Sequence, residues 1–169
     1  MATPDAGVAA NKEVVRRYLA AMERHDWDGA AECWAPDTIN RGSGRHEPTS
    51  AMIGREAIKR VFEALHMAFP DRHWQLDEMI AEGDWVICLM TVSGTFGMVP
   101  PRPPGPLPPN WLGVEGTALA SSSAKGKPYS VKHIHVFRIR DGFVAEHLAA
   151  RDDLGLLLQL GAIAPPVPA

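Results

Sequence analysis

The spacing of apolar residues changes near Pro70, and this change restricts the chain to folds in which helices precede a sheet. Before Pro70, residues 11–22 and 54–70 repeat apolar side chains at the period of an amphipathic helix. Between them, Asp26 or Asp28 can cap a second short helix that ends at Pro36. Beyond Pro70 the period falls to about two, which predicts strands. These lie at 73–80, 85–96, 114–120 and in a hairpin from Ser130, before a short helix ended by Gly161.

This order predicts an α+β fold with a meandering antiparallel sheet. The three N-terminal helices carry apolar stripes and have only the sheet to pack against, so we expect them to cover one of its faces. A curved sheet covered in this way forms a cone-shaped body with a pocket inside.

The chain of 169 residues has the length of one domain. We expect a flexible N-terminus at 1–10, a single domain at 11–162 and a proline-rich tail at 163–169. Seven prolines between Val99 and Trp111 predict a proline-rich insertion at about 99–112, because proline cannot donate to a sheet. It is either a loop without a role or a lid whose Trp111 covers a ligand.

Composition excludes several classes of function. A net charge of −3 leaves no basic excess for a phosphate backbone, so we predict no nucleic-acid partner. No leader and no long apolar run is visible, which predicts a cytoplasmic protein without a membrane partner. Cys33 and Cys88 lie in apolar segments and are expected to be free buried thiols. No glycine-rich phosphate loop, Cys-x-x-Cys pair or Gly-x-Ser-x-Gly elbow occurs.

Three histidines lie in the predicted hairpin "SVKHIHVFRIRDGFVAEH". A three-residue turn at 140–142 would place Ile139 opposite Phe143. His135 then falls opposite His147, and position 133 falls opposite 149. All three imidazoles would share one face with Phe137, whereas a shift by one residue would scatter them.

Histidines grouped in this way fit acid/base chemistry, because the pKa of imidazole lies nearest neutrality. Three histidines can also bind zinc. However, His133 and His135 are two apart on one strand, and the nearby carboxylates show no recognised ligand spacing. We therefore predict no metal.

The hairpin and following helix, "IHVFRIRDGFVAEH" to "QLG", resemble the SnoaL-like polyketide cyclases of the nuclear transport factor 2-like superfamily. "AFPDRHWQLDEMIAEGDWV" from Ala68 and "GREAIKRVF" from Gly54 support the resemblance. It implies a helix-covered cone with an apolar pocket, and a homodimer or higher homo-oligomer packed through the outer sheet face. It also implies cofactor-independent ring closure, by an intramolecular aldol condensation of a polyketide methyl ester.

The family uses an aspartate as general acid/base beside a histidine. The resemblance places that histidine at His135 and the aspartate at Ala149, while a second aspartate of the motif is kept as Asp152. With the carboxylate absent, a histidine can take over its role, and we expect His133 to lie opposite Ala149. Our hypothesis is that His135 and His147 form the acid/base pair, with His133 orienting them.

The expected substrate is a small apolar or polycyclic molecule that carries a carbonyl group. Its predicted contacts are Asn40, Trp74, Phe96, Trp111, Phe137 and Asp152; core packing is an equal interpretation of Trp74. Alternatives to a cyclase are an isomerase, dehydratase or hydrolase on the same fold, a protein that binds a ligand without catalysis, and an adaptor module.

Overall fold

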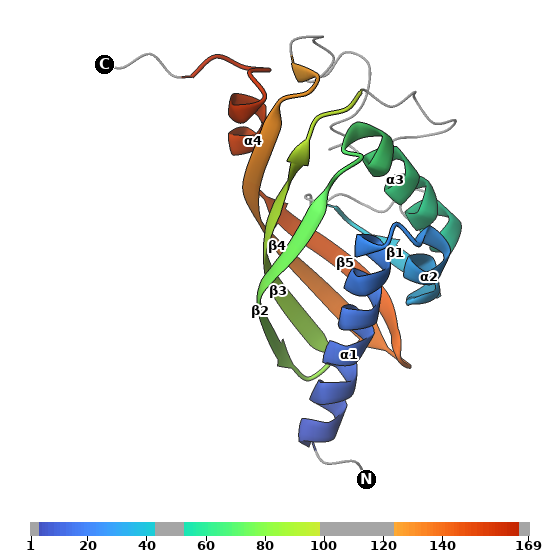
Figure 1. Ribbon diagram of the computed structural model, residues 1–169. Helices are drawn as coiled ribbons and strands as arrows, with labels where there is room; N and C mark the ends of the chain where they lie inside the picture. The colour runs from blue at the N-terminus through green and yellow to red at the C-terminus, as the bar shows by residue number, and fades with distance from the viewer. Residues whose placement is uncertain (1–3, 43–52, 99–123, 166–169) are drawn as a thin grey trace.

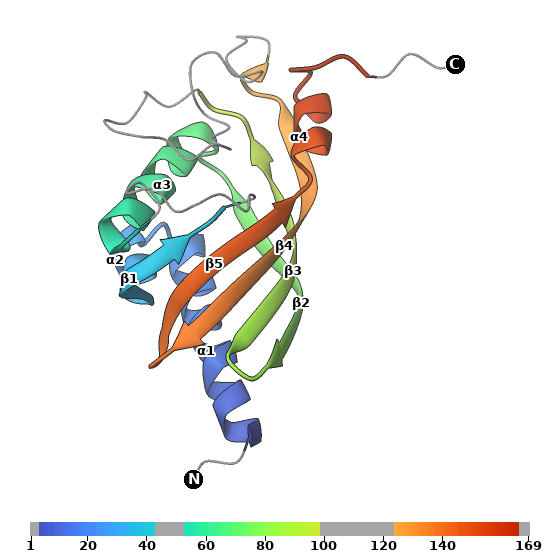
Figure 2. The same ribbon diagram turned by 180° about the vertical axis from the view of Figure 1, so that it is seen from behind.

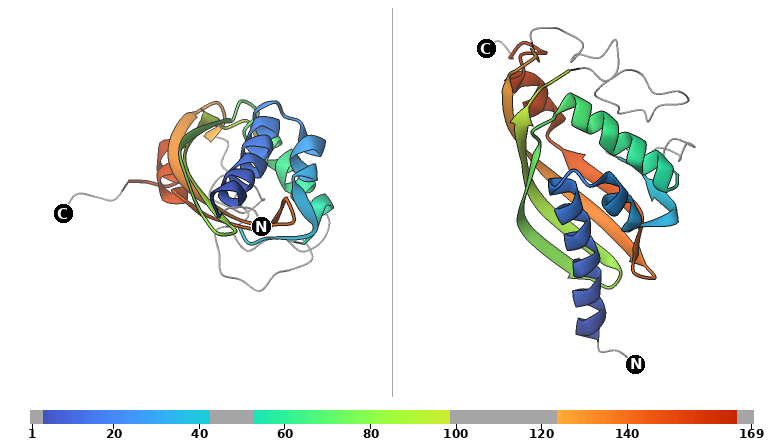
Figure 3. Two further views of the ribbon diagram at one scale, coloured as in Figure 1. Left: turned by 90° about the horizontal axis from the view of Figure 1, so that it is seen from below. Right: turned by 45° about the vertical axis from the view of Figure 1, so that its right-hand side comes forward.

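The computed structural model describes residues 4–42, 53–98 and 124–165, which form one curved five-stranded sheet packed against helices (Figure 1). The elements are α1 (Pro4–Glu23), α2 (Trp27–Glu32), β1 (Trp34–Asn40), α3 (Arg55–Ala68), β2 (His73–Glu82), β3 (Trp85–Thr95), β4 (Pro128–Arg140), β5 (Phe143–Arg151) and α4 (Asp153–Gln159). The strand order is β1-β5-β4-β3-β2. Helices α1, α2 and α3 lie in the hollow of the sheet (Figures 2 and 3), which confirms the predicted α+β architecture.

The helices follow the predicted pattern with one difference. Val15, Tyr18 and Met22 of α1 are buried toward the sheet, and the Asp26 side chain caps α2 by accepting from the Gly29 N–H. However, α1 begins at Pro4, so residues 4–10 are helical where a flexible N-terminus was expected. This segment is rich in alanine, which has the highest helix propensity.

Strand β1 was not predicted from the sequence. It runs parallel to β5, so the sheet is mixed rather than wholly antiparallel. Its segment "WAPDTIN" lacks strict alternation and contains Pro36, which signals a break. Proline is tolerated here because β1 is an edge strand. At its end, Asn40 pairs with His147 of β5.

The register predicted for the β4–β5 hairpin was wrong. The turn has two residues, Asp141 and Gly142, both with positive φ, and Arg140 rather than Ile139 lies opposite Phe143. One extra residue, Ala145, then forms a β-bulge, because Glu146 pairs with Arg138 while Val144 pairs with Ile139.

Beyond the bulge, His135 lies opposite Ala149, His133 opposite Arg151 and Phe137 opposite His147. Ala149 therefore faces His135, not His133 as expected. Each pairing differs from the prediction by two residues, and an even shift keeps every side chain on its predicted face. The three histidines consequently share one face, as the sequence analysis expected, although by a different turn.

Several expectations fall outside the described residues. These are the proline-rich insertion with Trp111 and the strand at 114–120; in the described sheet β3 pairs directly with β4. Gly161 ends α4 with a positive φ, as predicted. Cys33 and Cys88 are buried and free. In the described ranges, no helix is both long and apolar enough to cross a membrane.

Candidate active site

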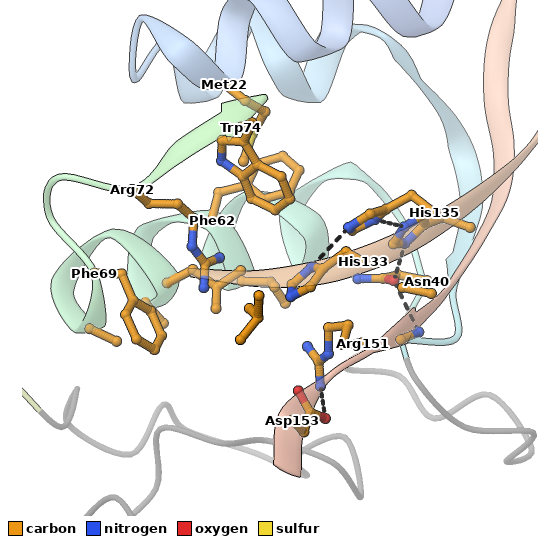
Figure 4. A pocket seen from close by; sticks show the side chains of 18 of the residues that line it. Met22, Asn40, Phe62, Phe69, Arg72, Trp74, His133, His135, Arg151 and Asp153 are labelled. Atoms are coloured by element: carbon orange, nitrogen blue, oxygen red, sulfur yellow. Dashed lines mark hydrogen bonds and ion pairs between the residues drawn. The ribbon is translucent and has the colours of Figure 1, made fainter. Parts of the chain in front are cut away.

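A cavity lies between the hollow face of the sheet and the helices, and it is mostly apolar with a polar side (Figure 4). Its apolar wall comes from α1, α3 and β4, together with Trp34 and Trp74. The polar side chains that line it come from five segments: Asn40, Arg72, His133, His135, His147, Arg151 and Asp153, with Tyr18 and Tyr129 also in the wall. An apolar pocket with few convergent polar groups is typical of a small-molecule site.

The three imidazoles form a hydrogen-bonded row rather than converging on one point. His133 Nδ1 lies 3.2 Å from His135 Nε2, and His135 Nδ1 lies 2.9 Å from His147 Nε2. His147 Nδ1 lies 2.9 Å from the Oδ1 of Asn40. All three rings are more than nine-tenths buried. We call this arrangement the histidine row.

The backbone of Gly42 fixes the direction of the histidine row. Its N–H donates to Asn40 Oδ1 at 3.2 Å, so this amide atom is the carbonyl oxygen and can only accept from His147. His147 must then carry its proton on Nδ1 and accept at Nε2 from His135 Nδ1–H. The same argument places the proton of His133 on Nδ1. Its Nε2 is therefore the one ring nitrogen of the row without a hydrogen-bond partner among the described residues.

The pKa values agree with three neutral rings. Burial, helped by the positive charges of Arg72 and Arg151, lowers the pKa of His133 to about 3. Burial and Arg151 lower the pKa of His147 to about 3. Burial, then His147 and His133, holds the pKa of His135 well below its usual range. At neutral pH each ring therefore has one donor and one acceptor, as the histidine row requires.

Aromatic rings hold the histidine row in place. Phe137 stacks on His147 with ring centroids 4.9 Å apart, and Trp34 contacts His147 edge-on at 5.5 Å. Trp74 meets His135 edge-on at 5.4 Å. Because large rings pack on both sides, the imidazoles have little freedom to rotate out of the row.

Two arginines lie beside His133. Arg72 precedes β2, donates from Nε to the Tyr129 hydroxyl at 3.2 Å and lies over the rings of Phe69 and Trp74. Arg151, at the end of β5, lies opposite His133 and forms an ion pair with Asp153 at 3.2 Å.

The structure brings only part of the predicted contact set to the cavity. Asn40 and Trp74 line it, as do the three histidines and Ala149. Phe96 is instead buried against Phe69, and Phe137 is fully buried behind His147. Asp152 caps α4, accepting from the Gly155 N–H at 2.8 Å.

Sequence reasoning missed Arg72, Arg151 and Asp153. Arg151 follows His147 and Ala149 at alternate positions of one strand, and this spacing could have placed it on the histidine face. Arg72 precedes Trp74 by two residues in the same way. No group of three or more histidine, cysteine, aspartate or glutamate side chains in the described part of the chain is arranged to hold a metal ion.

The fold and the cavity define a class of protein, an α+β domain with a mostly apolar small-molecule pocket. The SnoaL-like domain model matches residues 15–147, and the chain belongs to this family. It is 29% identical over 150 residues to aklanonic acid methyl ester cyclase of Streptomyces peucetius, covering 88% of this chain and 89% of that protein.

Solved structures agree with this assignment. AclR from Streptomyces galilaeus, a proposed hydroxylase, is 25% identical with a TM-score of 0.68, covering 95% of this chain and 86% of that one. A proposed SnoaL-like polyketide cyclase from Jannaschia is 20% identical with a TM-score of 0.72, covering 98% and 99%, and shows the shared fold.

Proposed function

We propose that this protein is a cofactor-independent polyketide cyclase in which His133 moves the proton during an intramolecular aldol ring closure. The observation that carries the proposal is the histidine row, whose hydrogen bonds leave one ring nitrogen, His133 Nε2, with a lone pair that no described residue occupies, in a mostly apolar cavity. The similarity to aklanonic acid methyl ester cyclase supports this reaction type.

In the proposed step, His133 Nε2 removes a proton from a carbon next to a carbonyl group of the substrate. The substrate is thereby converted into an enolate. The enolate carbon attacks a second carbonyl of the same molecule and forms the new carbon–carbon bond. The resulting alkoxide takes the proton back from His133 Nε2–H. No atom is gained or lost, so the reaction needs no co-reactant.

This assignment reverses the roles expected from the sequence, where His135 and His147 were the acid/base pair. Both nitrogens of each of these rings are already hydrogen-bonded, so neither has a free lone pair for substrate. We propose instead that they are positioning residues. As charge develops on His133, its Nδ1–H is held by His135, and protons can shift along the histidine row toward Asn40.

A protein that binds a ligand without catalysis is the second candidate. The observation that favours it is the low pKa of His133, because a base with a pKa of about 3 takes a proton from carbon only against a large free-energy difference. Ala149, where the family's aspartate is expected, fits this alternative as well.

The test uses aklanonic acid methyl ester, the substrate named for the relative, in D₂O. Mass spectrometry follows deuterium uptake at acidic carbons, and chromatography separates the ring-closed product, which has the mass of its substrate apart from exchanged deuterium. The key variant is His133→Asn, because its amide N–H can still donate to His135 while Nε2 is removed. His73→Gln, an exposed residue outside the cavity, is the control.

We expect His133→Asn to lower turnover at least about 100-fold, a typical contribution of one acid/base group, while the control keeps wild-type turnover. Wild-type turnover in His133→Asn would contradict the role of His133. Binding without exchange or product in the wild-type protein would favour the second candidate. A product whose mass differs by the loss or gain of water would indicate dehydration or hydrolysis instead of cyclisation.

We also propose that the protein forms a homodimer or higher homo-oligomer through the outer sheet face. Ile80, Trp85 and Ile134 are exposed large apolar side chains on β2, β3 and β4 that alternate with the cavity-facing residues. Light scattering after size-exclusion chromatography should give a multiple of the monomer mass, and Ile134→Lys should shift it to the monomer.

A further inference from the structure

Among the described residues that line the cavity, the two arginines beside His133 outnumber the one carboxylate, that of Asp153. Arg151 is paired with Asp153, but Arg72 has no carboxylate partner among the described residues. After burial, the positive charges of both guanidinium groups contribute to the lowered pKa of His133. Figure 4 shows Arg72, Arg151 and His133 around the same part of the cavity.

Part of the hydrogen-bonding capacity of these arginines is unused. Within the described part of the chain, Arg72 donates only from its Nε, to the neutral Tyr129 hydroxyl, and the buried Nε of Arg151 has no partner. A partly buried charge and unpaired N–H groups cost free energy unless something satisfies them. Arginine is the side chain best suited to bind a planar oxygen anion, because its N–H groups form a rigid fork.

We propose that Arg72 and Arg151 form the subsite for an anionic oxygen of the ligand, held next to His133 Nε2. The group that carries this oxygen is a carboxylate, an ionised phenol or the enolate formed from a ketone or ester. The enolate case rests on the proposed function, whereas a stable anion binds here with or without catalysis.

This subsite also bears on the weakness of His133 as a base. A negative oxygen beside the imidazole favours its protonated form and partly cancels the effect of the two guanidinium groups. Proton removal then creates the imidazolium and the enolate together, next to positive charges that stabilise the oxygen. Arg72 would thus act on the anion and not merely cover the rings of Phe69 and Trp74.

The test compares two probes of similar shape, 2-naphthoate and 2-naphthamide, at pH 7. Binding is measured by calorimetry and by quenching of tryptophan fluorescence, since Trp34 and Trp74 line the cavity. The variants are Arg72→Gln, Arg72→Lys and Arg151→Gln. Arg138→Gln is the matched control, because Arg138 is exposed and paired with Asp84.

We expect the wild-type protein to bind the naphthoate at least about tenfold more tightly than the amide, because one hydrogen bond to a charged group accounts for a difference in affinity of about this size. Arg72→Gln and Arg151→Gln should each reduce this preference at least about fivefold. Arg72→Lys, which keeps the charge and can replace Arg72→Gln if that variant does not fold, should retain part of it. Arg138→Gln should not change it.

Equal binding of the two probes to the wild-type protein, binding of neither, or an unchanged preference in both glutamine variants would overturn the proposal. His133→Asn separates this proposal from the proposed function, because it should keep the naphthoate preference while losing turnover. With the ester substrate, a higher KM in Arg72→Gln identifies a stable anion in the subsite. A lower kcat at constant KM identifies the enolate.

Discussion

Lowering the pH from 7 to 5 is expected to destabilise the fold through the histidine row. Burial lowers the pKa of His133 and His147 to about 3 and holds that of His135 well below its usual range. In the unfolded chain each ring has a pKa of about 6.5. Between these values the unfolded state binds more protons, so the stabilisation is complete above pH 6.5 and is lost as the pH falls.

The size of the effect depends mainly on the unfolded chain. As long as a folded ring takes up no proton at pH 5, protonation of the unfolded state costs about 2 kcal/mol per ring between pH 7 and pH 5. Three rings give about 6 kcal/mol, a large part of the stability of an ordinary domain. Paired carboxylates such as Asp77 and Asp84, whose pKa values are lowered by Lys132 and Arg138, stay ionised in this range.

Urea unfolding at pH 7 and pH 5, followed by tryptophan fluorescence, measures the difference in the free energy of unfolding. His133→Asn should reduce the pH-dependent loss by about a third, to about 4 kcal/mol, whatever its effect at pH 7. His73→Gln, at the surface, should keep the wild-type loss. A wild-type loss below about 2 kcal/mol would refute the reasoning, because the folded rings would then accept protons readily.

Four further outcomes are expected. Nitrogen-15 NMR at pH 7 should show His133, His135 and His147 as neutral rings protonated at Nδ1, and an Nε2–H signal from His147 would contradict the direction of the histidine row. Asn40→Leu should lower turnover about tenfold with little change in KM, and Asn40→Asp, which restores an acceptor, should recover most of it. Ala149→Asp places a carboxylate opposite His135 and should raise the pKa of that ring in an NMR titration, whereas Ala149→Asn should not. Phe137→Ala should cost about 3–5 kcal/mol in urea unfolding, because Phe137 is fully buried.

The sequence was sufficient for the features that depend on periodicity. Helices α1 and α3 and strands β2, β3, β4 and β5 follow from apolar spacing, and the shared histidine face follows from alternation along β4. Strand β1 was missed because its sequence is short, irregular and interrupted by Pro36, and only pairing with β5 makes it a strand. Asn40 owes its place beside His147 to that pairing.

The site was predicted less completely, for a different physical reason. Which histidine keeps a nitrogen that no described residue bonds depends on the other hydrogen bonds of the rings, and these need distances that a sequence does not contain. Arg72 and Arg151 were overlooked because the chain has 17 lysines and arginines, and such side chains are usually exposed at the surface. Burial beside His133 is what distinguishes these two.

The bulge at Ala145 determines how the length of this hairpin can vary. Residues 145 and 146 together face Arg138, so loss of Ala145 alone would leave Val144 opposite Ile139 and Glu146 opposite Arg138. That deletion would give a regular hairpin and would keep the histidine row. Loss of Leu148 would instead turn the side chains of residues 149–151 to the opposite face of the sheet. A three-residue turn without a bulge would contain the same number of residues and would give the same pairing beyond it. Hairpins of different length can therefore present the same histidine face, provided that each extra residue lies in the turn or between the turn and His147.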